Sequence, residues 1–181
     1  APGQPPIVPG DPAEGPEILL SVWADGRVVA LNGHADLGTG IRTALAQIVA
    51  DELDVPLARV EMILGDTARA PNQGPTIASA SLQLHAAPLR CAAAQARGWL
   101  IARAAQHLGA DPADPVALAG LTARDGRVGG IPFEDLVGDQ RTVLALDTSV
   151  ALKPPGEDRI VGQSVPRTDL PAKAGGDPVL R

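Results

Sequence analysis

The stretch GHADLGTGIRTALAQIVADELDV, residues 33–55, decides how this chain folds. Its apolar residues recur at the three- and four-residue spacing of one helix face: Ile41, Ala44, Leu45, Ile48, Val49 and Leu53. Pro56 follows, so the helix is predicted to stop near Asp54. The small-residue turn Gly38-Thr39-Gly40 stands directly before the helix, where glycine would let the backbone come close to a ligand.

Strand signals flank this helix on both sides. Residues 17–33 alternate between apolar and polar, and Asp25-Gly26 between two β-branched runs indicates a hairpin. The run VEMIL, residues 60–64, predicts another strand, and residues 65–79 predict a long loop.

An Ala-rich stretch predicts a second helix, which begins near Ser79 or Pro88 and reaches Leu108 before the C-terminal stop at Gly109. Asp125-Gly126 marks a second hairpin. The run PFEDLV, residues 132–137, is compatible with one helical turn.

The two ends of the chain are rich in Pro and Gly. Residues 1–16 are predicted to form an extended N-terminal arm, and residues 139–181 an extended tail that packs on a partner subunit. The compact part between them, residues 17–138, is predicted to be an α+β domain: a small mixed sheet with β-hairpins and two main helices. The first residue is Ala, so a leading segment is expected to have been removed, and a cleaved export signal stays open.

Composition excludes several classes of partner. The 181 residues carry 15 basic and 21 acidic side chains, a net charge of −6, which argues against nucleic acid and against an anionic membrane surface. No apolar run approaches the roughly 20 residues of a membrane span. The single cysteine, Cys91, permits neither an internal disulfide nor a thiolate metal cluster and is expected to be buried and inert.

Two small-residue loops that open helical stretches are candidate binding elements. The first is Gly38-Thr39-Gly40, because the free N–H groups of a helix N-terminus attract anions. The second is GPTIASAS, residues 74–81, whose hydroxyls and amides suit phosphate or pterin atoms. Taken singly, the first is better explained by a turn with Thr39 as helix cap, and the second by Ser/Thr capping. Together they favour a shared slot that the two loops face.

No residue in this chain has the pattern of a catalytic or metal-ligating group. The histidines, His34, His85 and His107, lack metal-ligand spacing, although His34 is expected near the glycine turn. No nucleophile elbow and no phosphate-binding P-loop occur, and Asp66 is best explained as a turn former.

The segment GHADLGTGIRTALAQIVADELDVPLARVEMILGDTARAPNQGPTIASASLQ resembles the molybdopterin-binding large subunit of the xanthine dehydrogenase and aldehyde oxidase family. It is most similar to the branch with isoquinoline 1-oxidoreductase, nicotinate dehydrogenase and membrane-bound aldehyde dehydrogenase. The resemblance runs from about residue 17 to 173, and IVGQSVPRTDLPAKAGG resembles the family's linker into its next domain.

The resemblance implies that both loops contact the molybdenum cofactor, in its cytosine dinucleotide form. The family's turn reads G-Q-G, and Thr39 stands here in place of the Gln, so one side-chain contact at the molybdenum end differs. The loop that matches T-x-A-S-x-S is implied to wrap the pterin and its phosphates. The implied cofactor-binding residues are Leu37, Gly38, Thr39, Gly40, Thr76, Ala78, Ser79, Ala80 and Ser81.

The resemblance also implies a heteromeric complex that oxidises an aldehyde or hydroxylates an N-heterocycle with water as oxygen source. Its expected partners are a molybdopterin-binding large subunit, a [2Fe-2S] subunit and a cytochrome c subunit. The family's catalytic glutamate has no match in this chain, so the isolated chain, whether a separate subunit or a processed piece, is expected to be inactive. Two alternatives stay open: a structural subunit that braces such a complex, and an unrelated binding module with an acidic surface. The compartment, bacterial cytoplasm or periplasm, also stays open.

Overall fold

A three-stranded sheet forms the base of the fold in the computed structural model, which describes residues 18–139 and 141–175. β1 (Leu20–Val22) and β2 (Val28–Asn32) pair antiparallel, with Ser21 opposite Val29. β3 (Val60–Leu64) pairs parallel to β2, with Ala30 opposite Met62. The parallel pairing requires a crossover between β2 and β3, and α1 (Ile41–Leu53) with the short 3₁₀ turn η1 (Leu57–Arg59) supplies it.

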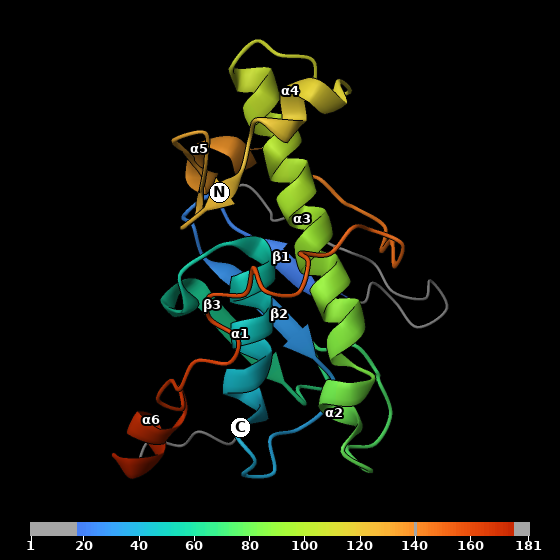
Figure 1. Cartoon of the computed structure of the whole chain (residues 1–181). Coiled ribbons are helices and arrows are strands. Elements are labelled where there is room, and N and C mark those ends of the chain that lie inside the picture. The colour runs from blue at the N-terminus through green and yellow to red at the C-terminus, as the bar shows by residue number, and fades with distance from the viewer. Residues whose placement is uncertain (1–17, 140, 176–181) are drawn as a thin grey trace.

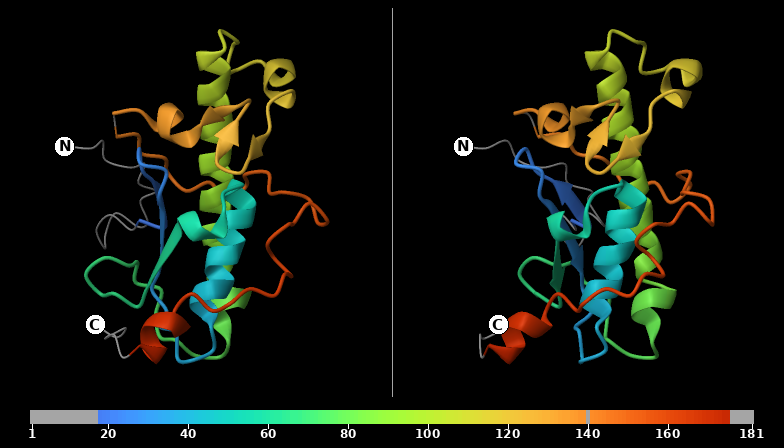
Figure 2. Two further views of the ribbon diagram at one scale, coloured as in Figure 1. Left: turned by 90° about the vertical axis from the view of Figure 1, so that its left-hand side faces the viewer. Right: turned by 60° about the vertical axis from the view of Figure 1, so that its left-hand side comes forward.

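Two helices cover one face of this sheet. α1 and the longer α3 (Ala86–His107) lie side by side, and both begin at the same end of the molecule (Figures 1 and 2). The short helix α2 (Ala80–Gln83) precedes α3 at that end. Small alanine side chains on α3 allow α1 and the sheet to approach it closely.

A second, smaller unit packs against the far end of α3. It contains α4 (Pro115–Ala119), the strands β4 (Ala123–Arg124), β5 (Arg127–Val128) and β6 (Ile131–Pro132), and α5 (Phe133–Val137). These three strands form an antiparallel sheet in the order β4-β5-β6. Figure 2 shows the unit beside the upper half of α3.

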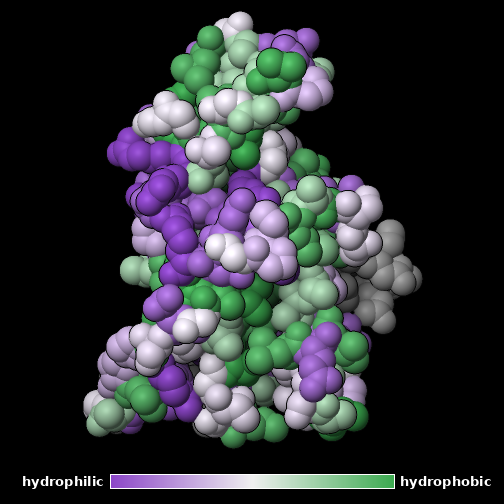
Figure 3. All heavy atoms as spheres, viewed as in Figure 1, coloured by the Kyte–Doolittle hydropathy of each residue, from purple (hydrophilic) through white to green (hydrophobic). Residues whose placement is uncertain are grey.

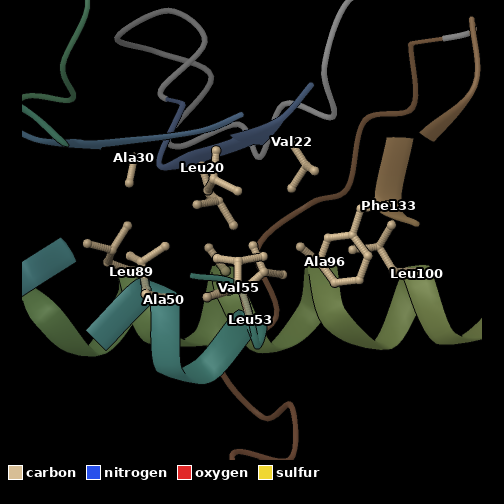
Figure 4. Packing of buried hydrophobic residues seen from close by; sticks show 14 of the residues in the cluster. Leu20, Val22, Ala30, Ala50, Leu53, Val55, Leu89, Ala96, Leu100 and Phe133 are labelled. Carbon is tan, nitrogen blue, oxygen red and sulfur yellow. The ribbon is translucent and has the colours of Figure 1, made fainter. Parts of the chain in front are cut away.

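One hydrophobic core joins these elements (Figure 4). Leu89 and Ala96 point from α3 toward the sheet, and Leu100 lies beside Phe133. Ala50 and Leu53 close the core from α1, and Phe133 closes it from α5 with no exposed surface. The sheet and both main helices are therefore held by contacts within this chain.

The predicted α+β class is confirmed. Both predicted hairpins form: Asp25-Gly26 connects β1 to β2, and Asp125-Gly126 connects β4 to β5. α1 ends at Leu53, and Asp54 follows in the left-handed conformation with φ 62°. The second main helix, predicted to begin near Ser79 or Pro88 and to reach Leu108, is α3, which begins at Ala86 and ends at His107, and the separate short helix α2 precedes it.

Residues 141–175 run across α1 and α3 of their own chain (Figure 2). Their only helix is α6 (Leu170–Ala174). The carboxylate of Asp51 accepts hydrogen bonds from the backbone N–H groups of Arg159, Ile160 and Val161. Glu52 accepts from the N–H of Lys153 and forms ion pairs with Arg90 and Arg97. That the tail also packs on a partner subunit stays a prediction.

The predicted N-terminal arm, residues 1–16, lies outside the described residues. Among the helices that the structure describes, none has both the length and the apolar character needed to cross a bilayer.

Candidate functional site

The two candidate loops line one pocket of about 370 Å³. From the first loop it is lined by Ala35, Leu37, Thr39 and Ile41, and from the second by Thr76, Ile77, Ala78, Ser79, Ser81 and Leu82. The pocket therefore lies at the end of the molecule where α1 and α3 begin (Figure 1). The shared slot expected from the sequence is present in the structure.

Sheet topology brings these loops together. β2 ends at Asn32 and β3 ends at Leu64, and because the two strands are parallel, both loops leave the same edge of the sheet. The carboxyl ends of parallel strands are the usual ligand-binding edge of such sheets. Two cross-loop hydrogen bonds fix the arrangement: Gly33 N–H donates to Gln73 Oε1 at 2.8 Å, and Ala35 N–H donates to Thr76 Oγ1 at 2.9 Å.

Asp36 holds the first loop against the start of α1. Its carboxylate accepts from the backbone N–H groups of Gly38 at 2.9 Å, Gly40 at 3.2 Å and Arg42 at 3.2 Å. Gly38 and Gly40 have φ values of 99° and 80°, which only glycine adopts readily. The prediction that Thr39 caps the helix is therefore wrong. The N-cap residue is Gly40, which makes no side-chain bond, and the carboxylate of Asp36 caps the helix instead.

This cap changes how the first loop can bind an anion. Burial by itself would raise the pKa of Asp36, but the N–H groups of Arg42, Gly38 and Gly40 stabilise its charged form, and the net effect lowers the pKa. The start of α1 thus already carries a bound carboxylate, and the N–H groups of Gly38 and Gly40 are donated within the chain. What this loop presents to the pocket is Leu37 and Thr39.

A residue far along the chain completes the first loop. Arg167 donates from Nη1 to the carbonyl oxygen of Gly38 at 2.8 Å, and its guanidinium is paired with Asp169. The sequence contained no local signal for this contact, because 129 residues separate Arg167 from Gly38.

The second loop keeps its hydrogen-bond donors available. Ala78 and Ser79 both have left-handed backbone, with φ 54° and 55°. This conformation costs about 1–2 kcal/mol for each residue that is not glycine. Their N–H groups and the Ser79 hydroxyl find no acceptor among the described residues. Ser79 is the N-cap residue of α2 but makes no side-chain capping bond, so the capping explanation for this hydroxyl is not observed.

A buried histidine supports the same loop from behind. His34 is 1% exposed, and its Nδ1 lies 2.7 Å from Ser81 Oγ while its Nε2 lies 3.3 Å from the carbonyl oxygen of Gln73. The ring of His85 packs on it at a centroid distance of 4.2 Å. Burial, and then the nearby His34, lower the pKa of His85. Sequence reasoning expected His34 near the glycine turn but missed its bond to the second loop.

Large apolar side chains surround the mouth of the pocket. Leu37 is 73% exposed, Ile77 62% and Leu82 48%. Figure 3 shows apolar residues at the lower end of the molecule beside the starts of α1 and α2. Exposed leucines and an isoleucine clustered at a pocket are typical of a surface that another molecule covers.

Six of the nine residues implied as cofactor-binding line the pocket: Leu37, Thr39, Thr76, Ala78, Ser79 and Ser81. Gly38, Gly40 and Ala80 belong to the same two loops but do not line it. Within residues 18–139 and 141–175 no group of three or more His, Cys, Asp or Glu side chains is placed to hold a metal ion. The pocket lining itself offers hydroxyls, from Thr39, Thr76, Ser79 and Ser81.

A larger pocket, of about 460 Å³, lies between α3 and residues 151–159. In its wall, Lys153 and Arg159 are already paired with Asp54. This pocket thus belongs to the contact that holds residues 151–159 in place.

Comparison with known proteins identifies the fold that carries the pocket. The molybdopterin cofactor-binding domain family matches residues 4–160. The chain belongs to this family. The resemblance to the xanthine dehydrogenase group is thereby confirmed.

Relatives of this molybdopterin cofactor-binding domain include one of the nicotinate dehydrogenase subunits of Pseudomonas putida, with 48% identity over 160 residues. That match covers 88% of this chain and 13% of the relative. The membrane-bound aldehyde dehydrogenase (pyrroloquinoline-quinone) of Gluconacetobacter polyoxogenes is 29% identical over 93% of this chain and 22% of its own length. The crystal structure of quinoline 2-oxidoreductase from Pseudomonas putida 86 superposes with a TM-score of 0.51 and 27% identity, over 66% of this chain and 15% of that one. This chain thus spans less than a quarter of the length of each of these proteins.

Proposed function

We propose that the pocket between residues 35–41 and 76–82 binds the pterin dinucleotide of the molybdenum cofactor, and that the chain completes this site in a molybdenum hydroxylase. The observation that carries the proposal is the meeting of both loops in one pocket, within a domain of the molybdopterin cofactor-binding family.

The donor set fits such a ligand. A pterin offers ring N–H groups and acceptor nitrogens, and a dinucleotide adds phosphate oxygens, so the site needs both donors and acceptors. The second loop supplies the N–H groups of Ala78 and Ser79 and the hydroxyls of Thr76, Ser79 and Ser81. The volume of about 370 Å³ falls within the roughly 300–1,000 Å³ of small-molecule sites.

Each part of the pocket has a separate task. The N–H groups of Ala78 and Ser79 with the Ser79 hydroxyl would bind anionic oxygens, and Leu37 and Ile77 would exclude water from the ligand once a partner covers them. Asp36 and Arg167 hold the first loop in shape. When bound, the cofactor would supply the two-electron oxidation with water as oxygen source.

The relatives support proposals for the substrate class. Nicotinate dehydrogenase and quinoline 2-oxidoreductase favour an N-heterocycle, and the aldehyde dehydrogenase favours an aldehyde. We propose a heteromeric enzyme in which electrons pass to [2Fe-2S] clusters on another subunit and then to a cytochrome c subunit, with the cytosine dinucleotide as cofactor form. For the compartment we propose the bacterial cytoplasm or periplasm.

The test is cofactor content of the enzyme assembled with variant chains. Ser79→Ala removes a hydroxyl that makes no bond within the described chain, so folding should be unchanged. The double variant Ser79→Ala with Ser81→Ala should lower molybdenum and pterin content by about tenfold or more, since each lost bond to a charged or polar ligand is worth about 1–3 kcal/mol. Ser149→Ala, whose hydroxyl bonds Asp147 within its own turn, serves as the control.

The alternative hypothesis, that the chain is a structural subunit, predicts another outcome. If the chain only braced the complex, the double variant would keep full molybdenum and pterin content. That result would contradict the proposal and favour the bracing role.

A further inference from the structure

The hydrogen positions at His34 follow from its two partners. Nε2 faces the carbonyl oxygen of Gln73 at 3.3 Å, and a carbonyl can only accept a hydrogen bond. Nε2 therefore carries a hydrogen. The role of Nδ1, which lies 2.7 Å from Ser81 Oγ, depends on whether the ring is neutral or charged.

The surroundings of His34 offer no counter-ion for a charged ring. The side chain is 1% exposed, and among the described residues no carboxylate lies within ion-pair distance of it. The neighbour on its face is another imidazole, His85, which offers no negative charge. A buried charge without a counter-ion is costly. In the neutral ring with hydrogen on Nε2, Nδ1 is an acceptor, so the Ser81 hydroxyl donates to it.

Thr76 has the opposite arrangement. Ala35 N–H donates to Thr76 Oγ1 at 2.9 Å, so this oxygen already accepts a hydrogen bond while its own hydrogen is not used within the described chain. Ser81, by contrast, has given its hydrogen to His34 and keeps lone pairs. Both side chains line the same pocket.

We infer that His34 is a positioning residue that gives the pocket a fixed polarity: Ser81 accepts from an N–H of the ligand, and Thr76 donates to an acceptor atom of the ligand. The inference rests on the proposed function. It assigns which kind of ligand atom lies at Ser81 and which kind lies at Thr76. Ser81 faces an N–H group such as those of a pterin ring. It does not serve a phosphate oxygen, which has no hydrogen to give at neutral pH.

The tautomer can be measured without any ligand. The chain has three histidines, so ¹⁵N-histidine labelling of the full 181-residue chain gives few ring signals. The two ring-nitrogen signals that are lost in His34→Gln belong to His34. The inference predicts a protonated Nε2 and a bare Nδ1 for His34 at neutral pH. A protonated Nδ1 would overturn it.

Ligand selectivity is the second readout, with pterin and inorganic pyrophosphate as probes followed by NMR titration. Ser81→Ala should weaken pterin binding about fivefold or more and change pyrophosphate binding less than about twofold. Thr76→Val should weaken the binding of a probe that places an acceptor atom at Thr76. The control variant Ser149→Ala should change the binding of neither pterin nor pyrophosphate. Equal effects of Ser81→Ala on both probes would overturn the inference.

The two readouts separate the inference from the proposed function. If the wild-type chain binds neither probe, the proposed function fails and the inference fails with it. If both probes bind in the pocket but selectivity is insensitive to Ser81, the proposed function stands and only the inference fails.

Discussion

Replacing Asp51 by Ala tests the contact that fixes the path of residues 151–161. Asp51 is 3% exposed and lies in the last turns of α1. Its carboxylate accepts from the backbone N–H groups of Arg159 at 3.0 Å, Ile160 at 3.1 Å and Val161 at 2.8 Å. The alanine variant loses all three bonds at once and leaves the backbone donors without their acceptor.

The expected loss of stability follows from these bonds. A hydrogen bond to a charged group contributes about 1.5–3 kcal/mol, but the three share one acceptor and the freed N–H groups regain water, so the sum is about 2–4 kcal/mol. For a chain of this size the urea m value is about 2 kcal/mol/M, which gives a midpoint lower by about 1–2 M.

The same carboxylate gives the effect a pH dependence. Burial by itself raises the pKa of Asp51, but the N–H groups of Arg159, Val161 and Ile160 favour the charged form, and the folded pKa lies below the ordinary 3.8. At a pH between the folded pKa and the ordinary pKa, the carboxyl group of Asp51 has bound a proton in the unfolded chain but not in the folded chain. The stabilisation is therefore complete above pH 3.8 and is lost as the pH falls through the folded pKa, where the gap between wild type and variant should close.

Urea unfolding followed by far-UV circular dichroism, at neutral pH and again in acid, measures both effects. Asp158→Ala is the matched control, because it removes the same charge from an exposed position in the segment that Asp51 holds. A midpoint shift for Asp51→Ala no larger than that of the control would refute the reasoning.

Three further changes test the fold. Asp36→Ala removes the cap of α1 and should lower the free energy of unfolding by about 1 kcal/mol, seen by calorimetry as a lower Tm; an unchanged Tm would count against the cap. Gly33→Ala should destabilise more than Gly98→Ala, because a Cβ at Gly33 would clash with the backbone carbonyl oxygen of Pro71 while a Cβ at Gly98 would meet no neighbouring atom; equal losses in urea unfolding would contradict this. Phe133→Ala should cost about 3–5 kcal/mol in the same assay, and a loss below about 1 kcal/mol would show that the core does not depend on it.

Local signals in the sequence were sufficient for most of the fold. Asp-Gly turns predicted both hairpins, and the spacing of Ile41 to Leu53 predicted α1, because turn chemistry and helical period act between near neighbours. The start of the second main helix stayed open between Ser79 and Pro88, since an Ala-rich stretch has no apolar period that could show where a helix begins, and α3 begins at Ala86.

Long-range contacts explain what the sequence did not show about the site. The two loops were expected to share a slot, and the parallel pairing of β2 and β3 accounts for it. The cap by Asp36, the bond from His34 to Ser81 and the reach of Arg167 to Gly38 depend on the folded chain. These contacts show that the first loop is shaped within the chain, while the second loop keeps free donors.

A structure of the assembled, cofactor-loaded enzyme that contains this chain tests the central claim most directly. The account predicts cofactor atoms within hydrogen-bond distance of Ser79 or Ser81, with Thr39 at the same ligand. A cofactor bound on other subunits, with residues 37–40 and 76–81 out of its reach, would contradict it.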